Sequence, residues 1–411
     1  METLIEKVVA RQILDSRGIP TVEVDVVLEN GKVGRASTPS GLSRGSHEAF
    51  ELRDNLADFY AGRSVWQAVN NVNVVLAEKI VGMNVFRQKE IDDLMIELDG
   101  TPDKHRLGAN AILPVSLAVA RGAAESLEVP LYRYLGGIFA TGIPIPMVNV
   151  LNGGAHADNR LDIQEFMLVP HSFSSFADSL RATCETFYSL KRILHERGLS
   201  TNVGDEGGFA PDLESHEEAF DLLIQAIESA GYLPERQISL AIDAASNEFF
   251  EDGAYYFEGA KRTAKEMALM FEGWTQKYPI CSIEDGMAQD DWLGWLFLNE
   301  ILGDKIMIVG DDLFASNRLR IEKGVQKRAA NAVLVKPNQV GTLTETFESI
   351  RFSQNNGLKI ILSHRSGETI DAFIADLSVA VHADYIKSGS VSRTERTAKY
   401  NQLFRIESDM S

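Results

Sequence analysis

AVLVK, at residues 332–336, is one of six apolar runs in the second half of the chain that end in charged or metal-binding side chains. The others are LAID at 240–243, CSIE at 281–284, MIVGD at 307–311, IILSHR at 360–365 and ADYIK at 383–387. From Glu284 onward, the polar residues that end successive runs lie 27, 25, 28 and 23 positions apart. This spacing fits one strand and one returning helix, so it predicts a parallel β/α barrel.

The acidic residues that end three of these runs predict a metal site. Catalytic groups of such barrels lie at the carboxyl ends of the strands, so the three side chains should converge. A single Asp or Glu after a strand is most often a helix cap or a solvated loop residue. Three in succession favour a shared cation, and oxygen-only ligands favour Mg²⁺. The predicted ligands are Asp243, Glu284 and Asp311, with Asp285 and Asp312 in supporting positions.

The basic residues that follow predict proton abstraction next to a carboxylate. A lysine at a strand end is usually a surface charge, but Lys336 beside Mg²⁺ and Lys387 should have a lowered pKa and act as a base. The segment after the fifth run supplies donors for an oxyanion from His364, Arg365 and Ser366. A purely structural ion pair is the alternative for Arg365.

Two glycine-rich loops, VNVLNGGAHADN at 148–159 and NVGDEGGFAP at 202–211, follow strand-like runs and should reach the same mouth. Glycine pairs are also common in plain turns, so a structural interpretation stays open. The loops carry His156 and Glu206, and Glu165 lies in DIQEF between them. An acid is needed to protonate a departing hydroxyl, and Glu206 with Glu165 as its partner fits that role.

The first third of the chain predicts a separate α+β domain. Val22, Val24 and Val26 alternate with acidic residues, and Asn30-Gly31 is typical of a hairpin turn. Helical spacing follows at 65–81, 89–98 and 109–127. Residues 135–146 are rich in Gly and Pro, so we expect an N-terminal capping domain at 1–136 and the barrel at 137–411.

Composition limits the classes of binding partner that the chain is suited to. The net charge of −19 and the pI near 4.9 argue against nucleic acid, which needs a basic surface. No apolar run of about 18 residues occurs, and the charged start of the chain is unlike a signal peptide, so we expect a cytoplasmic protein without a membrane partner. Cys184 and Cys281 have the spacing of neither a zinc site nor a disulfide framework.

Several long segments resemble the enolase family over nearly the whole chain. They include ARQILDSRGIPTVEV at 10–24, DIQEFM at 162–167, NVGDEGGFAP at 202–211, SIEDGMAQDDW at 282–292, SHRSGET at 363–369 and RTERTAKYNQLFRIE at 393–407. The resemblance implies an α/β fold, with a C-terminal (β/α)8-type enolase barrel behind the N-terminal α+β domain. Sites of this superfamily use a Lys or His base together with Mg²⁺.

The resemblance also implies a reaction and its residues. The reaction is the hydro-lyase step of glycolysis, dehydration of 2-phosphoglycerate to phosphoenolpyruvate with two Mg²⁺ per site, in a homodimer or a ring of dimers. The implied residues are Lys336 as base, Glu206 as acid, and Glu165 and His156 as catalytic partners; Arg365, Ser366, Lys387, His364 and Gln164 as contacts of the small phosphorylated substrate; Asp243, Glu284 and Asp311 as ligands of the first metal, and Ser43 for the second.

The chain departs from the family pattern in its loops. SGLSRG at 40–45 replaces SGASTG, which brings in Leu42 and Arg44, and Arg160 ends GGAHADNR where a small polar residue is usual. Neutral drift is one interpretation. Arg44 and Arg160 as substrate contacts would instead favour a bulkier or more anionic ligand, as in a diverged relative such as a carboxyphosphonoenolpyruvate synthase. A non-catalytic binding protein on the same scaffold is a third alternative.

Overall fold

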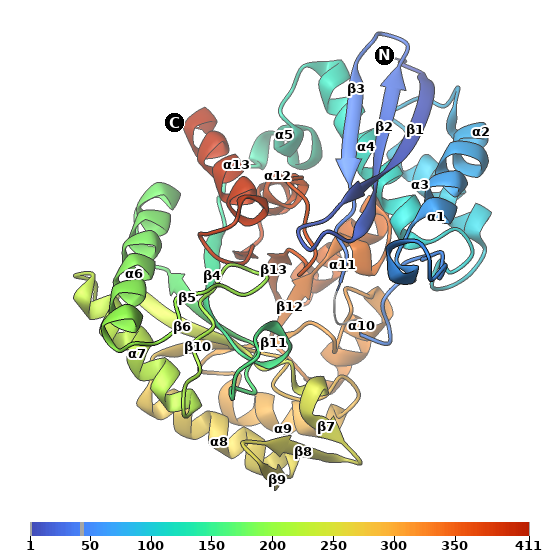
Figure 1. Ribbon diagram of the computed structural model, residues 1–411. Coiled ribbons are helices and arrows are strands. Elements are labelled where there is room, and N and C mark those ends of the chain that lie inside the picture. The colour runs from blue at the N-terminus through green and yellow to red at the C-terminus, as the bar shows by residue number, and fades with distance from the viewer. Residues whose placement is uncertain (1, 42–44, 411) are drawn as a thin grey trace.

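The computed structural model describes residues 2–41 and 45–410. Its N-terminal part is an antiparallel sheet covered by helices (Figure 1). The sheet has the strands β1 (Ile5–Leu14), β2 (Pro20–Leu28) and β3 (Val33–Ser37). The helices are η1 (Tyr60–Gly62), α1 (Trp66–Asn70), η2 (Asn71–Leu76), α2 (Ala77–Ile80), α3 (Gln88–Asp99), α4 (Ala109–Leu127) and α5 (Leu131–Gly136). The alternating valines Val22, Val24 and Val26 are fully buried.

Helix α4 packs unusually closely on this sheet. At Gly34 of β3, an added Cβ would lie 1.9 Å from the carbonyl oxygen of Ala118. Only a glycine allows the helix backbone to approach the strand so closely. One side of α4 therefore lies directly against the sheet. Arg121 on the same helix contacts Asp371 of the barrel.

Eight strands close the barrel in the order β10-β11-β12-β13-β14-β4-β5-β6. They are β4 (Ile145–Asn152), β5 (Glu165–Pro170), β6 (Ile238–Asp243), β10 (Ile280–Glu284), β11 (Met307–Gly310), β12 (Ala332–Val335), β13 (Lys359–Ser363) and β14 (Tyr385–Lys387). The six runs that predicted the barrel are β6 and β10 to β14, and consecutive members pair in parallel, as expected.

Strand β5 is the departure from an all-parallel barrel, because it runs antiparallel to both β4 and β6. Its first residue, Glu165, is opposite Asn152 at the end of β4 and Asp243 at the end of β6. In a parallel strand the last residue would reach the mouth of the barrel. Here the first one does, so Glu165 enters the site from the start of its strand.

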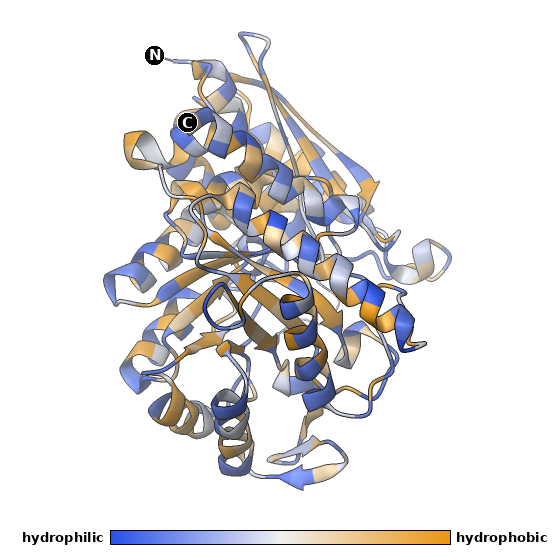
Figure 2. Cartoon of the chain, turned by 90° about the vertical axis from the view of Figure 1, so that its left-hand side faces the viewer, coloured by the Kyte–Doolittle hydropathy of each residue, from blue (hydrophilic) through white to orange (hydrophobic). Residues whose placement is uncertain are grey.

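Helices and a small sheet surround the barrel, whose strands are mostly apolar in Figure 2. Buried Met147, Met167 and Leu334 belong to the apolar cluster that the strands form. The flanking elements are η3 (Gly137–Phe139), η4 (Gly154–His156), α6 (Phe176–Glu196), α7 (His216–Ser229), η5 (Ser246–Phe249), β7 (Phe250–Glu251), β8 (Ala254–Phe257), β9 (Ala260–Arg262), α8 (Ala264–Lys277), α9 (Trp292–Leu302), α10 (Arg318–Lys327), η6 (Pro337–Gln339), α11 (Leu343–Asn355), α12 (Phe373–Ala380) and α13 (Thr394–Met410). Within the described residues, no helix combines the length and apolarity needed to cross a membrane.

A partly buried ion pair joins the N-terminal domain to the barrel. The guanidinium of Arg121 in α4 donates to both carboxylate oxygens of Asp371 at 2.6 Å, and Asp371 also accepts the backbone N–H of Ser37 at 2.9 Å. Burial opposes ionisation of Asp371, but Arg121 outweighs it and lowers the pKa of the carboxyl. Nearby, Ser40 and Gly367 exchange backbone hydrogen bonds. The N-terminal domain therefore fixes the loop after β13, which carries Arg365 and Ser366.

We expect Asp371→Asn to lower the free energy of unfolding by about 2–4 kcal/mol at pH 7, because it leaves Arg121 without its carboxylate. Since folding lowers the pKa of Asp371, its contribution is present above the ordinary Asp pKa of about 3.9 and is lost as the pH falls through the folded value. The difference between the proteins in urea denaturation should therefore shrink below about pH 4. Asp93→Asn, in an exposed pair with Lys89, is the matched control and should change little.

Candidate active site

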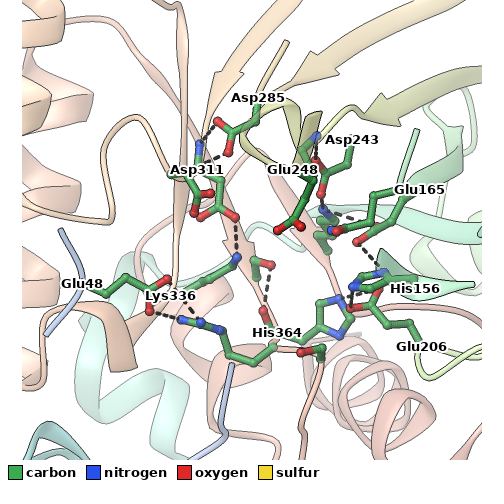
Figure 3. A pocket seen from close by; sticks show the side chains of 17 residues that line it. Glu48, His156, Glu165, Glu206, Asp243, Glu248, Asp285, Asp311, Lys336 and His364 are labelled. Carbon is green, nitrogen blue, oxygen red and sulfur yellow. Dashed lines mark hydrogen bonds and ion pairs between the residues drawn. The ribbon is translucent and has the colours of Figure 1, made fainter. Parts of the chain in front are cut away.

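A pocket lies at the carboxyl end of the barrel strands (Figure 3). Its lining is almost wholly polar: Glu48, His156, Gln164, Glu165, Glu206, Asp243, Ala245, Glu248, Asp285, Asp311, Asp312, Lys336, Ser363, His364, Arg365, Ser366 and Lys387. Glu48 comes from the N-terminal domain and the rest from the barrel. Glu284 lies directly behind this lining and is fully buried. Ser43 and Arg44, which the sequence also suggested, lie outside the described residues.

Lys387 holds three carboxylates together at the base of the pocket. Its Nζ lies 2.9 Å from Asp243, 2.9 Å from Glu284 and 3.3 Å from Glu165. All four side chains are buried, and burial opposes charge on Lys387, but the carboxylates raise the pKa of the ammonium well above its usual range. Burial, followed by the charge of Asp243, raises the pKa of the Glu284 carboxyl well above normal. Negative charge therefore exceeds positive charge here.

Lys336 and Asp311 form a second ion pair, partly buried, on the other side of the pocket (Figure 3). Burial and the positive charges of Arg365 and Lys387 favour the neutral amine, yet the adjoining Asp311 carboxylate raises the pKa of Lys336 overall. This direction is opposite to the sequence expectation. The reason is that the expectation counted Asp311 as a metal ligand and not as a direct partner of the lysine.

The acidic groups are chemically suited to a hard divalent cation. The side-chain oxygens of Asp285, Asp311 and Asp312 lie within 4.8 Å of one another. Asp285 accepts the backbone N–H groups of Asp311 at 3.0 Å and Asp312 at 2.8 Å, which is the supporting position that the sequence suggested. Asp243 and Glu284 share the Lys387 ammonium instead. Buried carboxylate oxygens with too little positive charge are the donors that Mg²⁺ binds.

Glu206 is held by donors on the opposite wall. Its carboxylate lies 3.4 Å from Nε2 of His364, and it accepts the amide of Asn149 at 3.3 Å. Nδ1 of His364 lies 2.6 Å from the guanidinium of buried Arg396. A guanidinium can only donate, so Nδ1 must accept and the ring proton must lie on Nε2, facing Glu206. Burial lowers the pKa of His364 to about 3, which agrees with this neutral form.

Glu165 and Glu206 have opposite pKa shifts. Burial and then the negative charge of Glu206 raise the pKa of Glu165 well above its usual range. Burial also opposes ionisation of Glu206, but His364 and His156 outweigh it and lower the pKa of Glu206 well below normal. His156 lies between the two, with Nδ1 3.9 Å from Glu165 and Nε2 3.8 Å from Glu206. Glu165 therefore favours its protonated form and Glu206 its ionised form.

Arg365 faces the pocket in a bidentate pair with Glu48, with N–O distances of 2.7 and 3.2 Å. Ser366 and Gln164 also line the pocket, and the carbonyl oxygen of the Gln164 side chain has no hydrogen-bond partner among the described residues. Arg160 lies elsewhere: its side chain is 58% exposed and pairs with Asp212 at 3.0 Å. The structure thus brings the other described candidates together and leaves Arg160 outside the pocket.

Three residues that complete the site did not stand out in the sequence. Glu48 pairs with Arg365, Arg396 holds His364, and Gln339 donates to Asp311 at 3.0 Å. Glu48 precedes an alternation of polar and apolar residues without a strand-end signal, and Arg396 lies within a charged helix. The sequence did not show that these side chains are buried. Burial would have indicated a partner, since a buried Arg or Glu must have one.

The barrel, its capping domain and this acid–base pocket are those of an enolase-superfamily enzyme. The model of the enolase N-terminal domain matches residues 5–135, and the model of the enolase C-terminal TIM barrel domain matches residues 140–411. Because the matches cover almost the whole chain, the chain belongs to the enolase family.

We expect Mg²⁺ to raise the melting temperature of the wild-type protein. A cation that binds only the folded state adds about 2.7 kcal/mol of stability when its free concentration is about 100 times its Kd. Asp311→Asn should reduce this Mg²⁺-dependent shift in a thermal melt. Asp212→Asn, which removes an exposed carboxylate outside the pocket, should keep the full shift. A full shift in Asp311→Asn would remove Asp311 from the ligand set.

Proposed function

We propose that this protein catalyses the Mg²⁺-dependent, reversible dehydration of 2-phosphoglycerate to phosphoenolpyruvate. The observation that carries the proposal is the placement of Lys336 and the Glu165–Glu206 pair on opposite sides of one pocket. A base and an acid are the two groups that such an elimination needs. Family membership supports the same reaction. The proposal includes a phosphorylated small-molecule substrate, a cytoplasmic glycolytic role and a homodimer or ring of dimers.

Lys336 takes the proton from the carbon next to the substrate carboxylate. The amine must be neutral to do so, and burial together with the charges of Arg365 and Lys387 favours the neutral form once Asp311 no longer pairs with Lys336. Asp243, Glu284 and Asp311 would hold Mg²⁺, which would supply positive charge against the negative charge that develops on the substrate carboxylate. Lys387 lies beside these carboxylates and provides a further fixed positive charge for the substrate carboxylate.

The Glu165–Glu206 pair supplies the proton for the departing hydroxyl, which leaves as water while the carbon–carbon double bond forms. The sequence suggested Glu206 as the donor, while the raised pKa of Glu165 makes Glu165 the partner that favours the protonated form. Either carboxyl can deliver it if the proton moves within the pair. Arg365 and Ser366 are suited to the phosphate, since a guanidinium binds a phosphate through two parallel hydrogen bonds.

The diverged-relative alternative now depends mainly on Leu42 and Arg44. Arg160 was its second support, but that side chain pairs with exposed Asp212 outside the pocket. The side chains proposed for proton transfer and for the first metal all line or adjoin one pocket, which favours the ordinary reaction over a non-catalytic role.

We expect purified protein with Mg²⁺ to convert 2-phosphoglycerate to phosphoenolpyruvate, followed by the ultraviolet absorbance of the product. Lys336→Ala should lose at least about 100-fold of this activity, because the general base is gone. No turnover of 2-phosphoglycerate by the wild type above the Lys336→Ala background would sink the assignment. Turnover of a bulkier phosphorylated or phosphonate acid in its place would identify the diverged relative.

We expect Glu165→Gln to separate the two proton transfers. Glutamine resembles the neutral acid in shape but cannot donate its proton, so dehydration should fall by about 100-fold or more. Lys336 is intact, so the substrate should still exchange its carbon-bound hydrogen with deuterated solvent, measured by NMR. Equal loss of exchange and dehydration in this variant would contradict the assigned roles, and Lys336→Ala should lose both.

A further inference from the structure

Gln339 is buried behind the pocket wall, at 1% exposure, and lies in the short helix η6 that follows Lys336. Its side-chain nitrogen donates to Asp311 at 3.0 Å and to Glu48 at 3.4 Å. Its side-chain oxygen accepts the hydroxyl of Ser316. The amide therefore uses both hydrogens of its nitrogen and its oxygen in three separate contacts.

The orientation of this amide is fixed by chemistry. Ionised carboxylates only accept hydrogen bonds, so the nitrogen must face Asp311 and Glu48. The reverse orientation would set the amide oxygen against two carboxylates and leave the Ser316 hydroxyl facing a donor. A neutral side chain with two hydrogens on one atom can satisfy both acids, and a third carboxylate at this position could not.

Each partner of Gln339 leads to a different part of the pocket. Asp311 is a proposed metal ligand and pairs with the amine of Lys336. The hydroxyl oxygen of Ser316 accepts the backbone N–H of Lys336 at 2.9 Å. Glu48 binds the guanidinium of Arg365 with both oxygens. One side chain thus contacts a metal ligand, the support of the base and the carboxylate that orients the anion-binding arginine.

We propose that Gln339 is a positioning residue that sets the orientation of Asp311, Lys336 and, through Glu48, Arg365. It lies outside the pocket lining and acts through these groups. The kinetic part of this inference rests on the proposed function, while the metal-binding part does not.

The first experiment measures Mg²⁺ binding without substrate by isothermal titration calorimetry. Gln339→Met keeps the length of the side chain but loses its hydrogen bonds, and we expect about tenfold weaker Mg²⁺ binding, as for other residues that orient metal ligands. Gln88→Met is the matched control. Gln88 donates to buried Asp92 at 3.1 Å in the N-terminal domain, so this variant should bind Mg²⁺ within about twofold of wild type.

Melting temperature in metal-free buffer shows whether each variant is folded. If Gln339→Met does not fold, Ser316→Ala decides, because it removes the hydroxyl that holds the amide and should weaken Mg²⁺ binding several-fold. If Gln339→Met folds and binds Mg²⁺ with unchanged affinity, the inference is overturned. If Gln339→Met does not fold, unchanged Mg²⁺ affinity in Ser316→Ala overturns it.

Steady-state kinetics with 2-phosphoglycerate give the second readout. We expect Gln339→Met to lower kcat and raise KM, with kcat/KM down about 10–100-fold, because both the base and Arg365 lose orientation. Gln88→Met should leave both constants unchanged even if it lowers the melting temperature. Weakened Mg²⁺ binding in Gln339→Met, combined with a wild type that does not turn over 2-phosphoglycerate, would refute the proposed function and leave the positioning role standing.

Discussion

The need to balance buried negative charge governs this structure. Asp243, Glu284 and Glu165 are placed around the ammonium of Lys387, away from solvent. Carboxylates in such a position are costly unless a cation is close to them. The barrel supplies one lysine for three acids, which leaves the site ready to bind further positive charge. Burial and the neighbouring negative charges raise the pKa values of Glu165 and Glu284, while His364 and His156 lower the pKa of Glu206.

Much of the fold could be predicted from the sequence because the barrel repeats one unit. Each of the six runs is buried on both faces, so it consists of consecutive apolar residues, and its end is marked by a polar side chain. Strand β5 did not fit this rule, since its polar residue comes first. The domain boundary near residue 136 falls between α5 and η3 and stays a prediction.

The candidate site was predictable where one residue ends one strand, as at Asp243, Lys336 and Lys387. It was not predictable where a role depends on two distant segments. Glu48 and Arg365 are 317 positions apart, and Arg396 reaches His364 from the final helix. The direction of the Lys336 pKa shift also depends on such a contact, because only the folded chain brings the Asp311 carboxylate against the amine. Local sequence patterns predict the residues at strand ends well, but they do not predict which distant residues pair.

The contact between Arg396 and His364 limits how protons can travel. A neutral imidazole relays a proton only if one nitrogen gains it while the other releases it, and here the nitrogen away from the pocket faces a guanidinium, which is already a hydrogen-bond donor at that position. No proton can enter the ring from that side. In the proposed reaction, the proton that the acid gives up therefore cannot be replaced from the protein interior through His364.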